Sequence, residues 1–207
     1  MNDVWPLVTR ELPASSAPPD ILERLRAMPD AVEELSDALE SIGVYTSVDL
    51  GDWCANRPAF LHVGPIATMR LGPKVVRAGD MRMGNAQIAP LLAPGSILVE
   101  DAHGCDGCVM GGFAARLLRD GGAEVAIVDG MARDPAECDE AGLTVVAATF
   151  GIRSGRETLQ ALEIGGPVTL RGRLFAGGDL GVVNRNGLVA IPSWLAWDDV
   201  RQLKPFS

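Results

Sequence analysis

The chain has 207 residues, of which 47% are hydrophobic, and its formal net charge is -9. This length and apolar content are sufficient for one sizeable core, so we expect one domain. The acidic balance disfavours a nucleic-acid partner, because phosphate binding needs clustered Lys and Arg, but it does not exclude a local site for a small anion.

The sequence contains no run of about 18 apolar residues, so we expect no membrane span. The N-terminus, MNDVWPLVTREL, lacks the basic segment followed by an apolar stretch that is typical of a secretory signal. The four cysteines are therefore predicted to be reduced thiols in a cytoplasmic protein.

Residues 1–19 carry four prolines and no periodic apolar pattern, which predicts an extended N-terminal arm. We expect one α/β domain over residues 20–207. It begins with a short helix over 21–28 and a second helix over 31–42, whose apolar residues repeat on one face and which ends at Gly43. The following fifteen residues, up to Pro58, predict a loop.

The middle of the chain alternates strands and helices. Its predicted elements are a strand over 62–71, a turn over 77–80, a helix over 85–92, a strand over 97–99, a glycine-rich loop over 102–112, a helix over 113–122 and a strand over 124–129. The glycine and proline of the first strand suggest an edge position or a bulge. The short connections favour a central βαβ unit with parallel strands and a right-handed crossover.

The last third of the chain predicts one helix, one strand and then hairpins. The helix covers 135–142, with Asp134 at its N-cap, and the strand covers 143–150. Residues 167–192 read as strands and turns, and Asn186-Gly187 is a strong hairpin signal. After a helical tail, the whole pattern predicts an α/β sandwich with C-terminal β-hairpins, and a doubly wound nucleotide-binding fold is not expected.

A glycine-rich loop, His103-Gly104-x-x-Gly107-x-x-x-Gly111-Gly112, follows one predicted strand and precedes a helix. Backbone N–H groups in such a loop can hold a small anion such as a carboxylate. The spacing matches neither the dinucleotide fingerprint nor the Walker A motif. The alternative is a purely structural turn.

Within this loop, His103-x-Cys105-x-x-Cys108 resembles half of a zinc or redox site. Zinc usually takes four ligands, and the other soft donors, Cys54, His62 and Cys138, are distant in sequence. The alternative is that small cysteine side chains fill tight positions beneath the loop.

The cluster Arg133-Asp134-x-x-Glu137 is the most informative candidate site, because it places charge at the end of a hydrophobic strand. Asp134 could simply cap a helix, and Arg133 could pair with Glu137. A functional reading is that the carboxylates bind a hard divalent cation while the guanidinium binds a carboxylate or a developing enolate. By contrast, four other arginines are expected to be solvated surface charges: Arg153, Arg156, Arg171 and Arg173.

The spacing Gly112, twenty residues, Arg133-Asp134, two residues and Glu137 resembles the motif of class II pyruvate aldolases. That family of 4-hydroxy-4-methyl-2-oxoglutarate and 4-carboxy-4-hydroxy-2-oxoadipate aldolases is related to the regulator of ribonuclease activity A, and is called RraA-like. The segments LSDALESIG, PGSILVED, VAIVDGMARD and GDLGVVNRNGLVAIP agree with it, so the resemblance covers residues 30–192.

The resemblance implies a swivelling β/β/α-type fold, a homotrimer or hexamer, and a divalent metal ion, Mg²⁺ or Mn²⁺. Asp134 and Glu137 would hold the metal, and Arg133 would stabilise the enolate and the carboxylate of a small 2-oxo acid. Backbone amides of Gly111, Gly112 and Phe113 would bind the pyruvyl carboxylate. The implied activity is a lyase that releases pyruvate by aldol cleavage or decarboxylation, and the alternative is a non-catalytic, protein-binding regulator.

Overall fold

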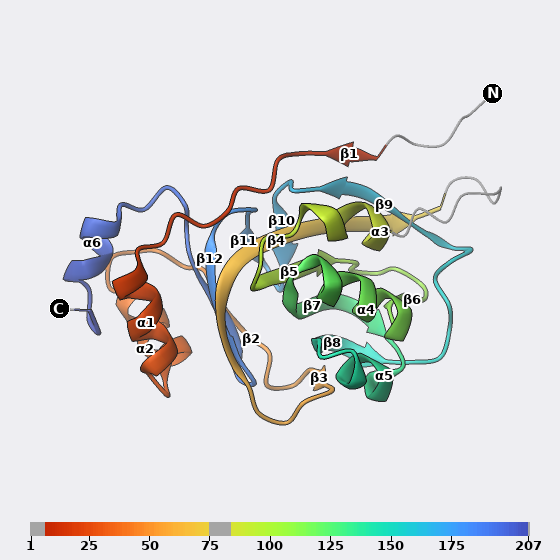
Figure 1. Cartoon of the computed structure of the whole chain (residues 1–207), viewed down its shortest axis with the longest axis horizontal. Helices are drawn as coiled ribbons and strands as arrows, with labels where there is room; N and C mark the ends of the chain where they lie inside the picture. The colour runs from red at the N-terminus through yellow and green to blue at the C-terminus, as the bar shows by residue number, and fades with distance from the viewer. Residues whose placement is uncertain (1–6, 75–83, 207) are drawn as a thin grey trace.

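The computed structural model describes residues 7–74 and 84–206, so the turn predicted over 77–80 lies outside the described residues. Within them the chain forms an 11-stranded sheet whose main path has the order β2-β13-β12-β4-β5-β7-β8-β3, with β1, β6 and β9 attached beside it. A separate pair, β10-β11, lies off this sheet. Figure 1 shows β4 as a long curved ribbon that joins the two halves of the sheet.

The bounds of the strands are β1 (Val8–Thr9), β2 (Ser47–Asp49), β3 (Cys54–Ala55), β4 (Leu61–Pro73), β5 (Ser96–Asp101), β6 (Cys108–Met110), β7 (Ala123–Ala132), β8 (Thr144–Phe150), β9 (Leu159–Ile164), β10 (Val168–Leu170), β11 (Arg173–Phe175), β12 (Leu180–Asn184) and β13 (Gly187–Ile191). The helices are α1 (Pro19–Ala27), α2 (Ala31–Glu40), α3 (Asn85–Ile88), the 3₁₀ turn η1 (Ala89–Leu91), α4 (Gly112–Gly121), α5 (Pro135–Glu140) and α6 (Trp197–Gln202).

Of the two alternatives predicted for the strand over 62–71, an edge position or a bulge, the edge position is wrong, because Met69 of β4 pairs with Glu100 of β5 and with Ile164 of β9. The first residues of β4, through Pro65, pair antiparallel with β12, and from Ile66 the strand pairs parallel with β5. Pro65 therefore lies where the strand changes partner. The predicted irregularity occurs further along, as a register shift between Arg70 and Leu71.

The central βαβ unit is confirmed. Strands β5 and β7 are parallel and connected through α4, and β7 and β8 are parallel and connected through α5. Two segments predicted as loops contain short strands instead. Cys54 of β3 pairs with Ala147, and Cys108 of β6 pairs with Met131, so both strands depend on residues distant in sequence.

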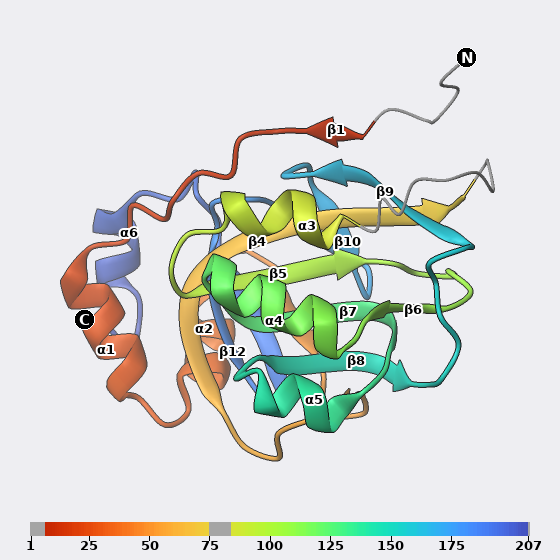
Figure 2. The same cartoon turned by 45° about the vertical axis from the view of Figure 1, so that its right-hand side comes forward.

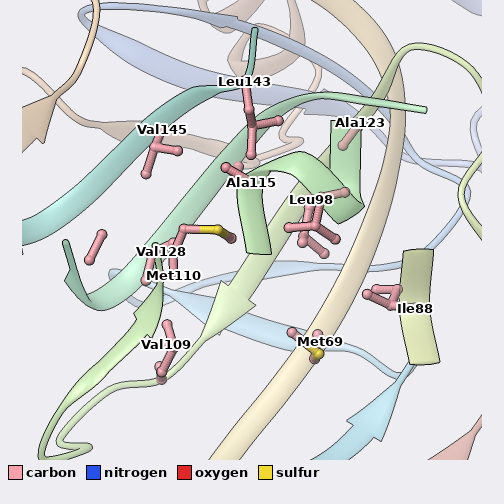
Figure 3. Close-up of a cluster of buried hydrophobic side chains, with 14 of the residues drawn as sticks. Met69, Ile88, Leu98, Val109, Met110, Ala115, Ala123, Val128, Leu143 and Val145 are labelled. Carbon is pink, nitrogen blue, oxygen red and sulfur yellow. The ribbon is translucent and has the colours of Figure 1, made fainter. Parts of the chain in front are cut away.

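The parallel strands bury both of their faces. In β5, Ile97 and Val99 contribute to one hydrophobic cluster and Leu98 to another, as expected from the two-residue period of a strand. Helix α4 covers the Leu98 side, where Ala115 and Leu118 are fully buried. Figure 3 shows this cluster beneath the helix, and it is the support on which α4 is held.

The C-terminal hairpins are also confirmed, since β10 pairs antiparallel with β11 and β12 with β13. The Asn186-Gly187 turn is closed by a hydrogen bond from the Asn186 N–H to Asn184 Oδ1, 2.8 Å.

Helices α1, α2 and α6 gather beside β12, away from α4 and α5 (Figure 2). The chain thus has the α/β fold class that its sequence predicts. In the part of the chain that the structure describes, no helix is long and apolar enough to cross a membrane.

Candidate active site

A cleft of about 270 Å³ opens where β7 ends and α4 begins. Five of the six residues that the sequence singles out as site residues line this cleft: Gly111, Gly112, Phe113, Arg133 and Asp134. The two segments are tied together by a backbone hydrogen bond from the Arg133 N–H to the Met110 carbonyl oxygen, 3.0 Å. The sixth residue, Glu137, lies beside the cleft and is not part of its lining.

The N-terminus of α4 supplies hydrogen-bond donors to the cleft. Ala115 makes the first bond of the helix, to the Gly111 carbonyl oxygen, 2.9 Å. The amides of Gly112, Phe113 and Ala114 precede it and therefore have no intrahelical acceptors. No side chain caps this end of the helix. Such an end attracts an anion through its free N–H groups and through the helix dipole.

Both glycines of the turn lie in crowded surroundings, and Gly112 is the more tightly packed of the two. A Cβ atom on Gly111 would lie 3.0 Å from Asp134 Oδ2 and 3.1 Å from Arg133 Cγ. A Cβ on Gly112 would lie 2.2 Å from Glu137 Oε2 and 2.5 Å from Glu137 Cβ. Glu137 thus packs directly against the start of α4, and its carboxylate also lies 3.5 Å from Arg116. Only glycine allows α5 and α4 to approach this closely.

Asp134 occupies the N-cap position of α5, as predicted, but its side chain does not cap the helix. Its backbone is left-handed, with φ 54°, which is uncommon for a non-glycine residue and costs conformational free energy. Its carboxylate instead pairs with Arg133, whose Nε lies 3.1 Å from Oδ2. The turn therefore presents one cation and one carboxylate together at the cleft.

Four polar residues that the sequence analysis did not assign to the site also line the cleft: Asn85, Gln87, Ser154 and Arg156. Arg156, which was expected to be a solvated surface charge, lines the cleft along with Arg133, although it is largely exposed. Its loop is held there by β6, through the bond from the Cys108 N–H to the Arg153 carbonyl oxygen, 2.7 Å. Asn85 lies at the start of α3. No local sequence signal marks either residue, because tertiary pairing brings both to the site.

The His103-x-Cys105-x-x-Cys108 motif does not converge on one point. His103 and Cys105 line a second cavity, whereas Cys108 is buried at the first cleft. Burial raises the pKa of the Cys105 and Cys108 thiols, and it raises the pKa of Cys138 to about 11. These thiols are therefore protonated near neutral pH, although zinc ligation and thiol chemistry require the thiolate.

The cleft offers oxygen donors to a metal ion. Across the described ranges, 7–74 and 84–206, no group of three or more His, Cys, Asp or Glu side chains is arranged to hold a metal. Mg²⁺, however, is often bound through one or two carboxylates and keeps several of its waters. Asp134 in the cleft, with Glu137 in the first turn of α5, fits this kind of binding by a hard cation such as Mg²⁺ or Mn²⁺.

Fold and cleft together define an α/β protein whose candidate site lies at the carboxyl ends of parallel strands, where a helix N-terminus meets an Arg-Asp turn. Residues 32–190 match the family model described as RraA-like, Aldolase/RraA, and the chain belongs to this family. No curated protein matches the chain at a significant level.

Solved structures with related folds agree with this assignment. Streptomyces coelicolor RraAS2, described as an unusual member of the RNase ES inhibitor RraA protein family, is 23% identical with a TM-score of 0.70, over 87% of this chain and 88% of that one. An uncharacterized protein from Pseudomonas syringae pv. tomato is 22% identical with a TM-score of 0.73, over 92% and 84%. A structure described under novel cellulases from microbes associated with the gut ecosystem is 17% identical with a TM-score of 0.76, over 91% and 86%. At these identities the likeness shows the fold alone.

Proposed function

We propose that the protein is a divalent-metal-dependent carbon–carbon lyase that releases pyruvate from a small 2-oxo acid, by aldol cleavage or by decarboxylation. The observation that carries this proposal is the meeting of three groups in one cleft. These are the free amides of the α4 N-terminus, the Arg133 guanidinium and the Asp134 carboxylate. Membership of the RraA-like family, which includes aldolases, supports it.

In this proposal the carboxylate of the 2-oxo acid binds to the amides of Gly112 and Phe113, which fixes the orientation of the substrate. Breaking the C–C bond moves an electron pair toward the 2-oxo oxygen and forms the enolate of pyruvate. Arg133, with Arg156 at the rim, supplies positive charge where this negative charge develops. Met110, which is buried, and Phe113, whose side chain is exposed, add apolar surface to the lining of the cleft.

A metal ion would be held by Asp134, with Glu137 nearby, together with waters. When bound, Mg²⁺ or Mn²⁺ would supply Lewis-acid polarisation of the 2-oxo group. Arg133 would then hold the Asp134 carboxylate in place through the Nε contact. We further propose a homotrimer or hexamer as the working assembly, on the basis of family resemblance.

Pyruvate formation tests the proposal. Protein purified without chelator would be assayed with oxaloacetate and with 4-hydroxy-2-oxopentanoate, with Mg²⁺ or Mn²⁺ added, after EDTA, and after the metal is restored. We expect EDTA to abolish activity and the metal to restore it. Asp134→Ala should be inactive in every condition, whereas Asp37→Ala, an exposed carboxylate on α2, should behave as the wild type. Activity that survives both EDTA and Asp134→Ala would contradict the proposal.

A second candidate function is a non-catalytic regulator that binds another protein. The observation that favours it is that two structural relatives are named as inhibitors, the RraAS2 protein above and the RNA-processing inhibitor RraA from Thermus thermophilis. The Thermus protein is 17% identical with a TM-score of 0.59, over 78% of this chain and 92% of that one. If no 2-oxo acid is turned over while the protein captures a ribonuclease in a pull-down, this function replaces the first.

A further inference from the structure

Glu100 is a buried acid that the reaction above does not use. It lies near the end of β5, none of its surface is exposed, and neither carboxyl oxygen has a hydrogen-bond partner in the part of the chain that the structure describes. Burial raises the pKa of this carboxyl to about 8, so Glu100 carries a proton at neutral pH. A protonated carboxyl is a hydrogen-bond donor, and a buried donor is rarely left without an acceptor.

The side chain of Glu100 points to the α4 side of the sheet. Side chains alternate along a strand, so Glu100 shares the face of Leu98, which belongs to the hydrophobic cluster beneath α4 (Figure 3). Its strand partners, Met69 and Val128, belong to the same cluster and are apolar. Asp101 faces the other way and lines the second cavity. The acceptor for the Glu100 proton therefore has to lie between the sheet and the helices on this face.

Asn85, the first residue of α3, carries a suitable acceptor. The preceding Gly84 packs against Met69, the neighbour of Glu100 in the sheet, so closely that a Cβ atom on Gly84 would clash with Met69 Sδ. Asn85 is buried, and its Nδ2 donates a hydrogen bond to the Val109 carbonyl oxygen, 3.2 Å. A carbonyl oxygen can only accept, so Oδ1 is the free end of this amide. Oδ1 is buried and receives no hydrogen bond from the described residues.

Competing partners on this face are accounted for among the described residues. The remaining buried side-chain atom without a partner there is Gln160 Nε2. Gln160 lies between Leu159 and Ala161 on β9, which both face the cluster, so its side chain points to the opposite face. The thiol of Cys138, also in the cluster, already contacts a backbone carbonyl oxygen, and burial raises its pKa to about 11. Burial is the single cause of the raised pKa of Glu100, so no charged side chain of the described residues faces it.

We propose that the Glu100 carboxyl donates a hydrogen bond to Asn85 Oδ1, and that this buried acid–amide pair holds the Gly111-Gly112 turn in place. One O–H···O bond satisfies both buried groups, and a change of rotamer at the long Glu100 side chain is needed to form it. The pairing goes beyond the proposed lyase function and does not depend on it. Its consequence for turnover rests on that function.

Asn85 connects the pair to the cleft. Its Nδ2 holds the carbonyl oxygen of Val109 in β6, and the carbonyl oxygen of the next residue, Met110, accepts the hydrogen bond from the Arg133 N–H. Once Glu100 loses its proton, its carboxylate offers acceptors only and repels Asn85 Oδ1. The turn is therefore held below about pH 8 and loosens as the pH rises above this value, so both residues act as positioning residues.

The first experiment measures the pKa of Glu100 by NMR of protein labelled at the glutamate carboxyl carbons, with the signal assigned by its absence in Glu100→Gln. In Asn85→Leu, which keeps the volume and removes the acceptor, the pKa should fall by roughly half to one pH unit, because the protonated form loses its hydrogen bond. If Asn85 only packs, the added apolar surface leaves the pKa unchanged or raises it, and that result would overturn the pairing. Gln202→Leu, on the exposed surface of α6, is the matched control.

The second experiment tests the positioning role without a substrate. Hydrogen exchange of the Arg133 amide would be compared between the wild type and Glu100→Gln at the same pH, so that the intrinsic exchange chemistry cancels. Glutamine does not ionise and keeps a donor for Asn85 Oδ1. The two proteins should exchange equally at pH 6, whereas at pH 9 the wild type should exchange roughly 5-fold faster or more, as expected for one lost buried hydrogen bond. The amide of Val182, in the far part of the sheet, reports global unfolding. A ratio at Arg133 no larger than that at Val182 would overturn the positioning role.

Pyruvate release from oxaloacetate with Mg²⁺ separates this inference from the lyase proposal. Between pH 7 and pH 9, kcat of the wild type should fall roughly 5-fold relative to that of Glu100→Gln, with KM little changed. If no pyruvate forms but the pKa falls in Asn85→Leu and the Arg133 amide responds to pH, the lyase function fails and the pair stands. If pyruvate forms while neither responds, the lyase function stands and the pair fails. Melting temperatures identify a variant that does not fold, and Asn85→Ala, for which the same fall in pKa is expected, then replaces Asn85→Leu.

Discussion

The cleft at the start of α4 and the second cavity of the molecule look alike at first sight. Both are lined by residues that follow parallel strands, and both contain an arginine beside a carboxylate. Each also contains one of the two non-glycine residues with positive φ in the described part of the chain, Asp134 at the cleft and Arg171 at the cavity. The cavity is the larger, about 710 Å³ against about 270 Å³. Neither size, charge nor backbone strain therefore distinguishes a reaction site from a surface hollow.

The two regions differ in the hydrogen-bonding capacity that they leave free. In the second cavity Arg171 pairs with Asp52, and its guanidinium lies 5.7 Å from the centre of the Trp53 ring, so its charge is already engaged. His103 lies 3.5 Å from Asp129. The cleft adds the first-turn amides of α4. Unused donors, rather than charge pairs, indicate where a ligand belongs.

The largest expected effect contrasts the two arginines. Arg133→Ala should lower kcat/KM for pyruvate release roughly 100- to 1000-fold, because it removes a cation placed where the enolate charge develops. Arg171→Ala should leave kcat/KM within about 2-fold of the wild type and reduce stability slightly, because it removes one partly exposed ion pair. Steady-state kinetics and thermal melts on both variants measure this difference. Similar losses of activity in the two variants would contradict the conclusion that the cleft, and not the second cavity, is the reaction site.

Gly112 at the cleft and Gly172 at the second cavity allow the packing of the two regions to be compared. In Gly112→Ala the new Cβ would meet Glu137, with contacts of 2.2 and 2.5 Å, so we expect about 1–3 kcal/mol of destabilisation and a lower kcat/KM as α4 shifts. Gly172, at the second cavity, has φ +79° and open space around its Cβ position. Gly172→Ala should cost about 1–2 kcal/mol of backbone strain without changing kcat/KM.

Adding Glu137→Gly to Gly112→Ala removes the clashing side chain and should restore part of the lost stability, as measured by chemical denaturation. If the double variant is as unstable as the sum of the two single variants, the packing of Glu137 against α4 is not the cause. The pair then behaves as two independent sites, and the contact between α4 and α5 has no role in shaping the cleft.

Much of the fold was predictable because its signals are local. The amphipathic pattern of α2, the glycine-bounded helix α4 and the apolar runs of β5 and β7 each lie within about ten residues. The strands β2, β3 and β6 were missed, and an edge position was one of the two alternatives given for β4, because their pairing partners lie far along the chain. For example, Ser47 pairs with Val189. Periodicity in one short segment cannot report such partners.

The same distinction applies to the candidate site. Arg133 and Asp134 are adjacent in sequence and follow a hydrophobic strand, so the pattern was visible, and the structure places them together with Gly111 and Gly112 at one cleft. Asn85 and Arg156 reach the cleft only through β6, which pairs with β7 and bridges to Ser154. Their presence at the cleft depends on tertiary contacts, and neither residue type nor spacing in the sequence predicts those contacts.

A buried acid on β5 should make stability depend on pH. Glu100 is fully buried, and burial raises the pKa of its carboxyl to about 8 from an ordinary value of 4.5. Because the native state holds this proton more tightly than the unfolded state, the stabilisation is complete below about pH 4.5 and is lost as the pH rises toward about 8. The expected slope is about 1.4 kcal/mol per pH unit in that window.

Glu100→Gln should remove this slope, whereas Glu157→Gln, at an exposed position, should keep it. Urea denaturation at pH 5, 6, 7 and 8 measures the free energy of unfolding for each protein. A slope that persists in Glu100→Gln would assign the pH dependence to other groups.

The smallest expected effect concerns Arg156, which is exposed at the rim of the cleft. Arg156→Ala should raise KM for a 2-oxo acid roughly 3- to 10-fold with little change in kcat, because a solvated guanidinium attracts the substrate carboxylate from a distance. Salt screens such an interaction, so the difference from the wild type should shrink in about 1 M NaCl, whereas the Arg133→Ala defect should persist. Arg173→Ala, an exposed arginine on β11, is the control. An unchanged KM would mean that Arg156 is only a solvated surface charge. A loss in kcat that persists at high salt would mean that Arg156, like Arg133, acts in the reaction itself.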